Sequence, residues 1–387
     1  MDDAADILNR IRDVVGSEPK TVPLHAPEFN GNEWSFVKEC IDTGWVSSVG
    51  SFVDDFERKV AAAAGTRNAV AVVNGTAALE IALRLVGVSP GDEVIVPALT
   101  FVATANAVTH IGAVPHFAEA TATTLCLDPI ALDAHLDQIA EHGPLGLVNR
   151  QTGRRIAAIV PMHALGYPVN MERLTELADR RGVAVVEDAA EALGSRFQGR
   201  PCGGLGRLGA FSFNGNKIIT TGGGGAVTTN DDDLAKRVKH LTTTAKVPHP
   251  WAFDHDAPGY NYRLPNLNAA LGCAQFEALP ARLAEKRALA ARYADAFADC
   301  KTAEMVHKAE DAGSNFWLNA IRLNEPDRRD HVLSQLNEAG IQARPLWRLM
   351  HRLPFHISCP RADLTVAEDL EARVICLPSS AQLGRSA

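Results

Sequence analysis

The sequence lacks the features that mark several large classes of protein. Its seven cysteines are scattered and form no CxxC pair, which argues against a disulfide framework and against a zinc site. It has no basic run, and its net charge of −8 argues against a nucleic-acid-binding protein. No apolar stretch approaches the roughly 18 residues of a membrane helix, and the acidic start lacks the basic region of a signal peptide. We therefore expect a cytoplasmic protein without metal, nucleic-acid or membrane partners.

Two nucleotide-binding motifs are missing or out of place. No GxxxxGK[ST] sequence is present, so a P-loop is not supported. Gly204, Gly206 and Gly209 do spell GxGxxG within "GGLGRLG". A dinucleotide fingerprint needs a buried strand before the glycines and a helix after them, whereas here a strand-like "AFSFN" follows. We therefore do not expect a Rossmann dehydrogenase.

The first two thirds of the 387-residue chain alternate short apolar runs with helical patterns. This alternation indicates an α/β fold, with helices on the faces of a sheet. Runs such as "VAVVED" are apolar on both faces, as expected of strands covered on both sides. Expected strands cover residues 68–73, 92–98, 113–119, 157–163, 183–190, 209–214 and 224–230, and expected helices cover 76–87, 101–112 and 170–182.

The pattern changes after about residue 245. Residues 264–300 are alanine-rich and predict a long helical segment, followed by a strand at 315–323, a helix at 327–340 and a strand at 341–347. The first 16 residues have the apolar spacing of a short amphipathic helix. A chain of this length exceeds one ordinary core. We expect a large domain over 1–245 and a smaller one over 246–387.

One lysine stands in an unusual place. Lys217 lies in "AFSFNGNKIITTGGGG", between a strand-like stretch and four glycines, and no carboxylate is available nearby to pair with it. An exposed surface lysine is the ordinary explanation. A lysine that bonds covalently to an aldehyde cofactor would explain the missing partner and could serve as a base when freed. Gly222–Gly225 would then permit sharp turns and close approach to the cofactor.

Two local patterns suit the phosphate of such a cofactor. Gly75 and Thr76 follow a strand and open a helix, where backbone N–H groups and a hydroxyl favour an anion. Viewed alone they are a turn and a helix cap. Ser212 lies five residues before Lys217 on the strand that enters the loop, and it could add another donor or be an ordinary turn serine.

Two further residues suit an aromatic ring. Asp188 ends a strand of the expected sheet, where α/β proteins bind ligands, and a buried aspartate needs a cation such as a protonated pyridine nitrogen. That pairing would keep the ring an electron sink. Asp188 could instead cap a helix. Phe101 follows another strand, so its ring could stack on the cofactor or belong to the core.

The order of Gly-Thr, an aromatic residue, "EDAAE", "SFNGNK" and "GYNYR" resembles the fold-type-I pyridoxal-phosphate enzymes of the DegT/DnrJ/StrS sugar-aminotransferase family. The resemblance runs from about residue 21 to the end. Stretches such as "GNEWSFVKECIDTGWVSSVG" and "ARPLWRLMHRLPF" are similar to the branch that acts on UDP-4-keto-6-deoxy-N-acetylglucosamine in bacillosamine and legionaminic acid synthesis. The resemblance implies a mixed, mostly parallel seven-stranded sheet flanked by helices, with a smaller α+β C-terminal domain.

The resemblance also implies roles for individual residues. Glu191 stands where most of the family has a glutamine against the pyridoxal hydroxyl, and a carboxylate offers different partners from an amide. The other cofactor roles are the covalent link at Lys217, the ring-nitrogen contact at Asp188, the phosphate contacts at Ser212, Gly75 and Thr76, and the stacking contact at Phe101.

Further positions concern the partner subunit and the substrate. Asn261 in "GYNYR" matches an asparagine that reaches the cofactor phosphate of the neighbouring subunit, which implies a homodimer with shared active sites. Arg263 and Arg344 are candidates for the nucleotide diphosphate, or form ordinary ion pairs. His163 could line the substrate pocket, or be a hydrogen-bonded core histidine.

The implied activity is a pyridoxal 5′-phosphate-dependent transfer of an amino group from L-glutamate to the keto carbon, C4, of a nucleotide-linked 4-keto-6-deoxy sugar, with pyridoxamine 5′-phosphate as the intermediate cofactor form. Other nucleotide sugars, amination at C3 and other fold-type-I chemistry remain open. A pyridoxal-phosphate-binding regulator without catalysis is a further alternative. The sugar 3-dehydratases of the family carry histidine at the lysine position, so Lys217 argues against them.

Overall fold

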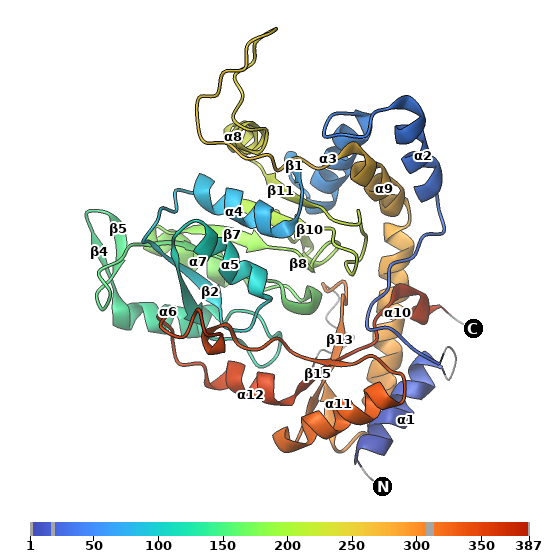
Figure 1. Cartoon of the computed structure of the whole chain (residues 1–387). Coiled ribbons are helices and arrows are strands. Elements are labelled where there is room, and N and C mark those ends of the chain that lie inside the picture. Colours follow the sequence, from blue (N-terminus) through green and yellow to red (C-terminus); the bar gives the residue numbers. More distant parts are fainter. Residues whose placement is uncertain (1–2, 17–19, 307–312, 386–387) are drawn as a thin grey trace.

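The computed structural model describes residues 3–16, 20–306 and 313–385, and its largest element is a mixed seven-stranded sheet (Figure 1). The strand order is β1-β11-β10-β7-β6-β2-β3. Neighbours from β10 to β3 are parallel, and β11 alone in this sheet runs the other way. The predicted mixed, mostly parallel sheet is confirmed. Its strands are β1 (Asn68–Val72), β2 (Glu93–Pro97), β3 (Val114–Ala118), β6 (Ile156–Ile159), β7 (Ala184–Asp188), β10 (Leu208–Ser212) and β11 (Gly225–Thr229).

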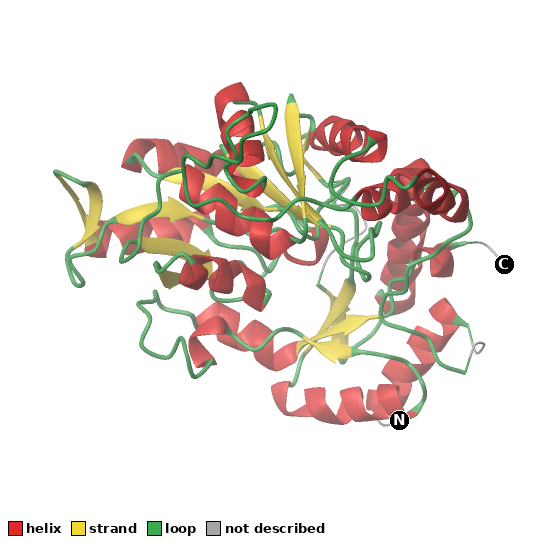
Figure 2. Ribbon diagram, turned by 45° about the horizontal axis from the view of Figure 1, so that its top comes forward, coloured by secondary structure: helices red, strands yellow, loops and turns green. Residues whose placement is uncertain are grey.

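Helices cover this sheet on both faces, as Figure 2 shows. β2 and β11 are buried along their whole length, as strands covered on both sides should be. No helix among the described residues is long and apolar enough to cross a bilayer. The helices of this part are α2 (Glu33–Thr43), α3 (Ser51–Ala64), α4 (Gly75–Leu85), α5 (Val102–His110), α6 (Pro129–Ile139), α7 (Met171–Arg181) and α8 (Asp232–Thr242).

The register of the sheet brings three sequence-distant segments together. Ala210 of β10 lies opposite Asp188, the last residue of β7. Gly225 of β11 pairs with Ser212 on one side and with Val72 on the other. The chain after β1 turns directly into α4, which packs on β7, β10 and β11. The end of β7, the end of β10 and the start of α4 therefore share one edge of the sheet.

A second sheet is built from the C-terminal part of the chain, and all its pairs are antiparallel, in the order β12-β13-β15-β14. Helix α1 (Asp3–Val15) packs there, since its apolar residues share a core with those of α10, α11 and β13. The predicted division near residue 245 stays a prediction. The remaining elements are α9 (Asn266–Glu277), α10 (Leu279–Phe297), β12 (Ala303–Met305), β13 (Asn319–Leu323), α11 (Arg329–Glu338), β14 (Arg344–Pro345), α12 (Thr365–Arg373) and β15 (Val374–Leu377).

Three C-terminal predictions were too long. The helical segment predicted over 264–300 is two helices, which break at Ala278, just before the proline in the first turn of α10. The strand predicted over 315–323 begins only at Asn319, because Phe316 has a left-handed backbone and the segment before it turns. The strand predicted over 341–347 is reduced to Arg344–Pro345.

The glycine motif that resembles a dinucleotide fingerprint has another function. The backbone N–H groups of Gly203, Leu205 and Gly206 donate to the carboxylate of Glu187 at 2.8, 2.6 and 2.6 Å. Glu187 is fully buried on β7. The loop leads into β10 rather than into a helix. The motif therefore encloses a buried carboxylate and satisfies its hydrogen bonds.

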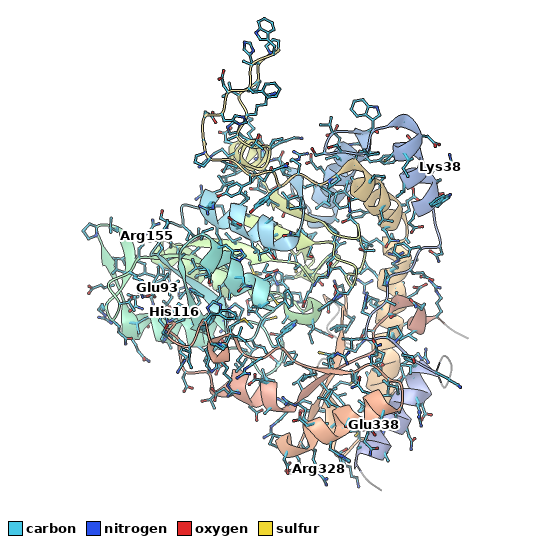
Figure 3. All side chains as sticks on the ribbon, viewed as in Figure 1. Lys38, Glu93, His116, Arg155, Arg328 and Glu338 are labelled. Atoms are coloured by element: carbon cyan, nitrogen blue, oxygen red, sulfur yellow. The ribbon has the colours of Figure 1, made fainter. Side chains whose placement is uncertain are left out.

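A second buried polar cluster lies at the other end of the sheet, under the hairpin of β4 (Ala140–Gly143) and β5 (Gly146–Asn149). Glu93 accepts hydrogen bonds from His116 at 2.8 Å and from the amide of Asn149 at 2.9 Å. Glu93 and His116 are labelled in Figure 3, away from the C-terminal sheet. This cluster ties the hairpin to the sheet. The other short elements are β8 (Arg196–Phe197), β9 (Arg200–Pro201) and four 3₁₀ turns at Ala164–Gly166, Pro326–Arg328, Met350–Arg352 and Ala381–Gly384.

Candidate active site

A cavity of about 280 Å³ opens at the shared edge of β7, β10 and α4. It is lined by strand ends and helix starts, the position where α/β sheets bind ligands. Trp317 and Trp347, from the C-terminal part of the chain, close one side. The cavity brings together seven of the predicted site residues: Gly75, Thr76, Phe101, Asp188, Glu191, Ser212 and Lys217.

Asp188 is a buried carboxylate that forms no ion pair within the part of the chain that the structure describes. Its side chain accepts a hydrogen bond from Thr104 at 2.7 Å and one from the N–H of Ala190 at 3.1 Å. Burial raises the pKa of Asp188, because the charged form is poorly solvated there. A protonated ring nitrogen in the cavity would supply the missing charge. The residue therefore fits the pyridine nitrogen of pyridoxal phosphate.

The start of α4 fits a phosphate group. Asn74 accepts from the N–H of Ala77 with its side chain and from Ala78 with its carbonyl. Within the described residues no acceptor meets the N–H groups of Gly75 and Thr76, which leaves them for an anion. A Cβ on Gly75 would lie 2.9 Å from the Cβ of Ser212, so only glycine allows β10 and α4 to come this close.

Part of the glycine run after Lys217 serves the same approach. A Cβ on Gly225 would lie 2.4 Å from the carbonyl group of Asn74. Gly222 has a φ of +78°, which a glycine adopts without strain. Gly223 faces open space in the cavity wall. The run therefore combines a turn with tight packing of β11 against the start of α4, and its contact with the cofactor stays a prediction.

Lys217 is not an exposed lysine, because only 12% of its side chain is accessible. Its Nζ lies 4.1 Å from the centre of the Trp317 ring and 3.3 Å from Oε1 of Glu191. The expectation that Lys217 has no carboxylate partner was therefore wrong. Glu191 stands 26 residues earlier in the sequence, and only the return of the chain from β7 to β10 brings the two side chains together.

Glu191 is held in this position from two sides. Its Oε2 accepts the N–H of Leu165 at 2.9 Å, and its backbone carbonyl accepts the amide of Asn315 at 2.8 Å. The residue is 3% exposed. Burial raises the pKa of the Glu191 carboxyl to about 7. This carboxyl, with its pKa shifted toward neutral pH, lies directly against the amine of Lys217.

Four predicted site residues lie outside the cavity wall. His163 is fully buried; its Nε2 lies 3.0 Å from Glu187 and its Nδ1 accepts the N–H of Val169, so the core-histidine alternative fits this structure. Arg263 is buried against Glu57 at 3.2 Å.

The other two are on the surface. Arg344 is exposed and donates to Asn337 at 3.0 Å. Asn261 is exposed beside α8. In a single chain, none of the predicted substrate-binding residues reaches the cavity.

Three further residues that contribute to the cavity or its support were not predicted from the sequence. Thr104, which orients Asp188, follows Phe101 by one helical turn and carried no signal of its own. Trp317 lies under Lys217 and donates its ring N–H to Asn216 at 2.8 Å. Trp347 comes from the segment after β14. The two tryptophans were visible in the sequence only as parts of expected strands.

The fold and the cavity define the class: this is a pyridoxal-phosphate-dependent transferase of fold type I, the fold of the solved aminotransferases that it matches. Residues 27–387 match the model of the DegT/DnrJ/EryC1/StrS aminotransferase family, and the chain belongs to that family. The members of the family depend on pyridoxal 5′-phosphate, so the predicted cofactor is confirmed.

Individual relatives cover almost the whole chain. GDP-perosamine synthase of Caulobacter vibrioides is 38% identical over 370 residues, which are 95% of each protein. GDP-perosamine synthase of Escherichia coli O157:H7 is 35% identical over 361 residues, 93% of each. Among solved structures, DesI in the presence of its TDP-sugar product matches with a TM-score of 0.82 at 31% identity, over 93% of this chain and 88% of that one.

We expect the substitution Thr104→Val to weaken the fold around Asp188. It removes the 2.7 Å hydrogen bond to a buried carboxylate, and we expect the free energy of unfolding of the cofactor-free chain to fall by about 1–3 kcal/mol in urea titrations. The matched control is Thr109→Val on the exposed side of the same helix, with a change below about 0.5 kcal/mol. Equal effects of the two substitutions would contradict the assigned support of Asp188.

Proposed function

We propose that the chain transfers the amino group of L-glutamate to the keto carbon, C4, of a nucleotide-linked 4-keto-6-deoxy sugar. The observation that carries this proposal is the meeting of Lys217, Asp188 and the open N–H groups of α4 in one cavity. Membership of the family supports the amino-transfer chemistry. The names of the relatives support a nucleotide sugar as the acceptor.

The proposed contacts divide the cavity into two ends. Asp188 holds the ring nitrogen, and Gly75, Thr76 and Ser212 hold the phosphate. Phe101, at the start of α5, is the proposed stacking residue. When bound, pyridoxal phosphate supplies an aldehyde that takes up the amino group and a ring that stores the electron pair of the broken C–H bond.

Lys217 is the proposed base. Its side chain lines the cavity, with Nζ in contact with both Glu191 and Trp317. In the first half of the reaction it would remove the proton from the α-carbon of glutamate, and in the second it would deliver a proton to the sugar carbon that receives nitrogen. Trp317 and Trp347 would limit the access of water to this proton transfer.

The substitution Lys217→Ala tests the proposal. We expect turnover to fall by at least about 10²–10⁴-fold, because the base is lost, and the visible absorbance of the lysine-bound cofactor to disappear. Lys236→Ala, at an exposed lysine of α8, is the control and should retain both signals. Turnover that persists together with the absorbance in Lys217→Ala would rule out the assigned role. A regulator without catalysis would show no spectral change when glutamate is added to the parent protein.

The resemblance of the sequence and the names of the relatives indicate different nucleotides in the substrate. The resemblance indicated a UDP-linked N-acetylated sugar, whereas the perosamine synthases carry GDP in their names. We therefore expect a GDP-linked 4-keto-6-deoxy sugar to discharge the amino form of the enzyme faster than its UDP- and dTDP-linked counterparts. Single-turnover absorbance measures the rate, and NMR of the product identifies the aminated carbon. A faster reaction with the UDP-linked N-acetylated sugar would contradict this prediction and support the substrate that the resemblance implied.

A homodimer with shared active sites is also part of the proposal. Residues 246–255 form a hairpin that projects beside α8, away from the body of the chain (Figure 1). Its tip carries Trp251 and Phe253, which are 80% and 78% exposed. Exposed aromatic side chains on a projecting segment are typical of a surface that another chain covers. Asn261, at the base of this segment, is the residue proposed to reach the cofactor phosphate of the partner.

Mixed dimers test the sharing of sites. Lys217→Ala and Asn261→Ala should each be defective alone, whereas chains of the two kinds, unfolded together and refolded, should regain activity. One site in each mixed dimer then combines an intact Lys217 with an intact Asn261 from the other chain. The control mixes Lys217→Ala with Asp188→Ala, which leaves no intact site. A protein that is monomeric in sedimentation, or a mixture without recovery, would contradict the shared site.

A further inference from the structure

Lys217 and Glu191 form a close pair in which a proton could pass from the amine to the carboxylate. We propose that Glu191 takes up the proton that Lys217 must lose when its amine bonds to the aldehyde of the cofactor. Glu191 would then be charged in the free protein and neutral in the loaded one. This inference rests on the proposed role of Lys217 as the cofactor-binding lysine.

The geometry leaves one carboxylate oxygen for this exchange. Oε2 of Glu191 is occupied by the N–H of Leu165 at 2.9 Å, which fixes the orientation of the carboxyl group. Oε1 faces Nζ of Lys217 at 3.3 Å. Both side chains line the same cavity, and Glu191 is 3% exposed. A proton can therefore pass between the two atoms directly, without a surface water.

The charges around Glu191 determine which form it takes. Lys217 is the strongest influence that favours its charged form, whereas burial and the carboxylate of Asp188 act against that form. The thiols of Cys126 and Cys376 also lie within electrostatic range and carry no charge near neutral pH, because burial raises the pKa of each to about 12. When Lys217 loses its charge, the N–H of Leu165 still favours the charged form, but burial, the largest influence, and Asp188 favour the protonated carboxyl.

All atoms and charges are accounted for in the proposed proton transfer. The nitrogen of Lys217 forms a C=N bond with the aldehyde carbon, and the aldehyde oxygen leaves as water with two of the three ammonium hydrogens. The third hydrogen passes to Oε1 of Glu191. One positive and one negative charge disappear together, so no unpaired carboxylate is left buried beside Asp188. A glutamine, the usual residue of the family at this position, could not accept this proton.

The number of protons released on cofactor binding tests the inference. Pyridoxal phosphate is added to cofactor-free parent protein and to Glu191→Gln in weak buffer with an indicator dye. At pH 8 we expect the variant to release about one proton more per chain than the parent, because only the parent retains the lysine proton. At pH 6, below the pKa of about 7, Glu191 is already neutral before binding, so the difference should vanish. The control Glu304→Gln, at an exposed glutamate of the C-terminal sheet, should behave as the parent.

The outcomes separate this inference from the proposed function. Borohydride reduction and peptide mapping come first: an adduct that is absent from Lys217 of the parent overturns the proposed function itself. An adduct at Lys217 with equal proton release from parent and variant at pH 8 overturns the inference alone. Should Glu191→Gln not fold, infrared difference spectra of the parent decide. Cofactor binding at pH 8 must then produce the C=O band of a protonated carboxyl group, and its absence overturns the inference.

Discussion

Two buried carboxylates in one cavity are the constraint on which the site depends. Asp188 and Glu191 are both 3% exposed, and among the described residues Lys217 is the one cationic side chain that lines the cavity with them. Desolvation makes each charge costly, and their mutual repulsion adds to the cost. Lys217 offsets Glu191, with which it is in contact, and leaves Asp188 with neutral donors. A second cation in the cavity would therefore stabilise Asp188, and the protonated ring nitrogen of the cofactor would be such a cation.

The sheet topology brings backbone and side-chain hydrogen-bond donors to this edge of the sheet. β11 runs against its neighbours, and its first residue, Gly225, fits between Asn74 and the end of β10 because it has no side chain. The open N–H groups of α4 then lie beside Ser212. Glu187, the residue before Asp188 on β7, accepts three backbone N–H groups and lies 3.0 Å from Nε2 of His163. The same strand thus carries one carboxylate that is enclosed by a loop and a second one that faces the cavity with two neutral donors.

The predicted site residues that do lie together in the cavity are those at strand ends and helix starts, which can be recognised from the adjacent sequence. Asp188 ends a strand and Thr76 begins a helix, and parallel order alone brings such ends to one edge of a sheet. The contact of Glu191 with Lys217 could not be predicted in this way, because it depends on how two loops fold back above the sheet. Trp317 was hidden in an apolar run that predicted a strand, and the left-handed turn at Phe316 redirected it into the cavity. The sequence around an arginine does not show whether it binds a ligand or forms an ion pair within the protein. Arg263 is paired with Glu57.

The charge of the cavity also bears on how a nucleotide sugar could bind. A diphosphate needs cationic or multiple N–H donors, yet Lys217 is the one cation that lines the cavity in the described chain, and the proposed chemistry occupies it. Arg263 and Arg344 do not reach it. Donors for the diphosphate must therefore come from outside this single-chain cavity. In the proposed homodimer, the projecting hairpin would be a source of such donors for the partner, because it carries Lys246, His249 and His255 next to its exposed aromatic tip.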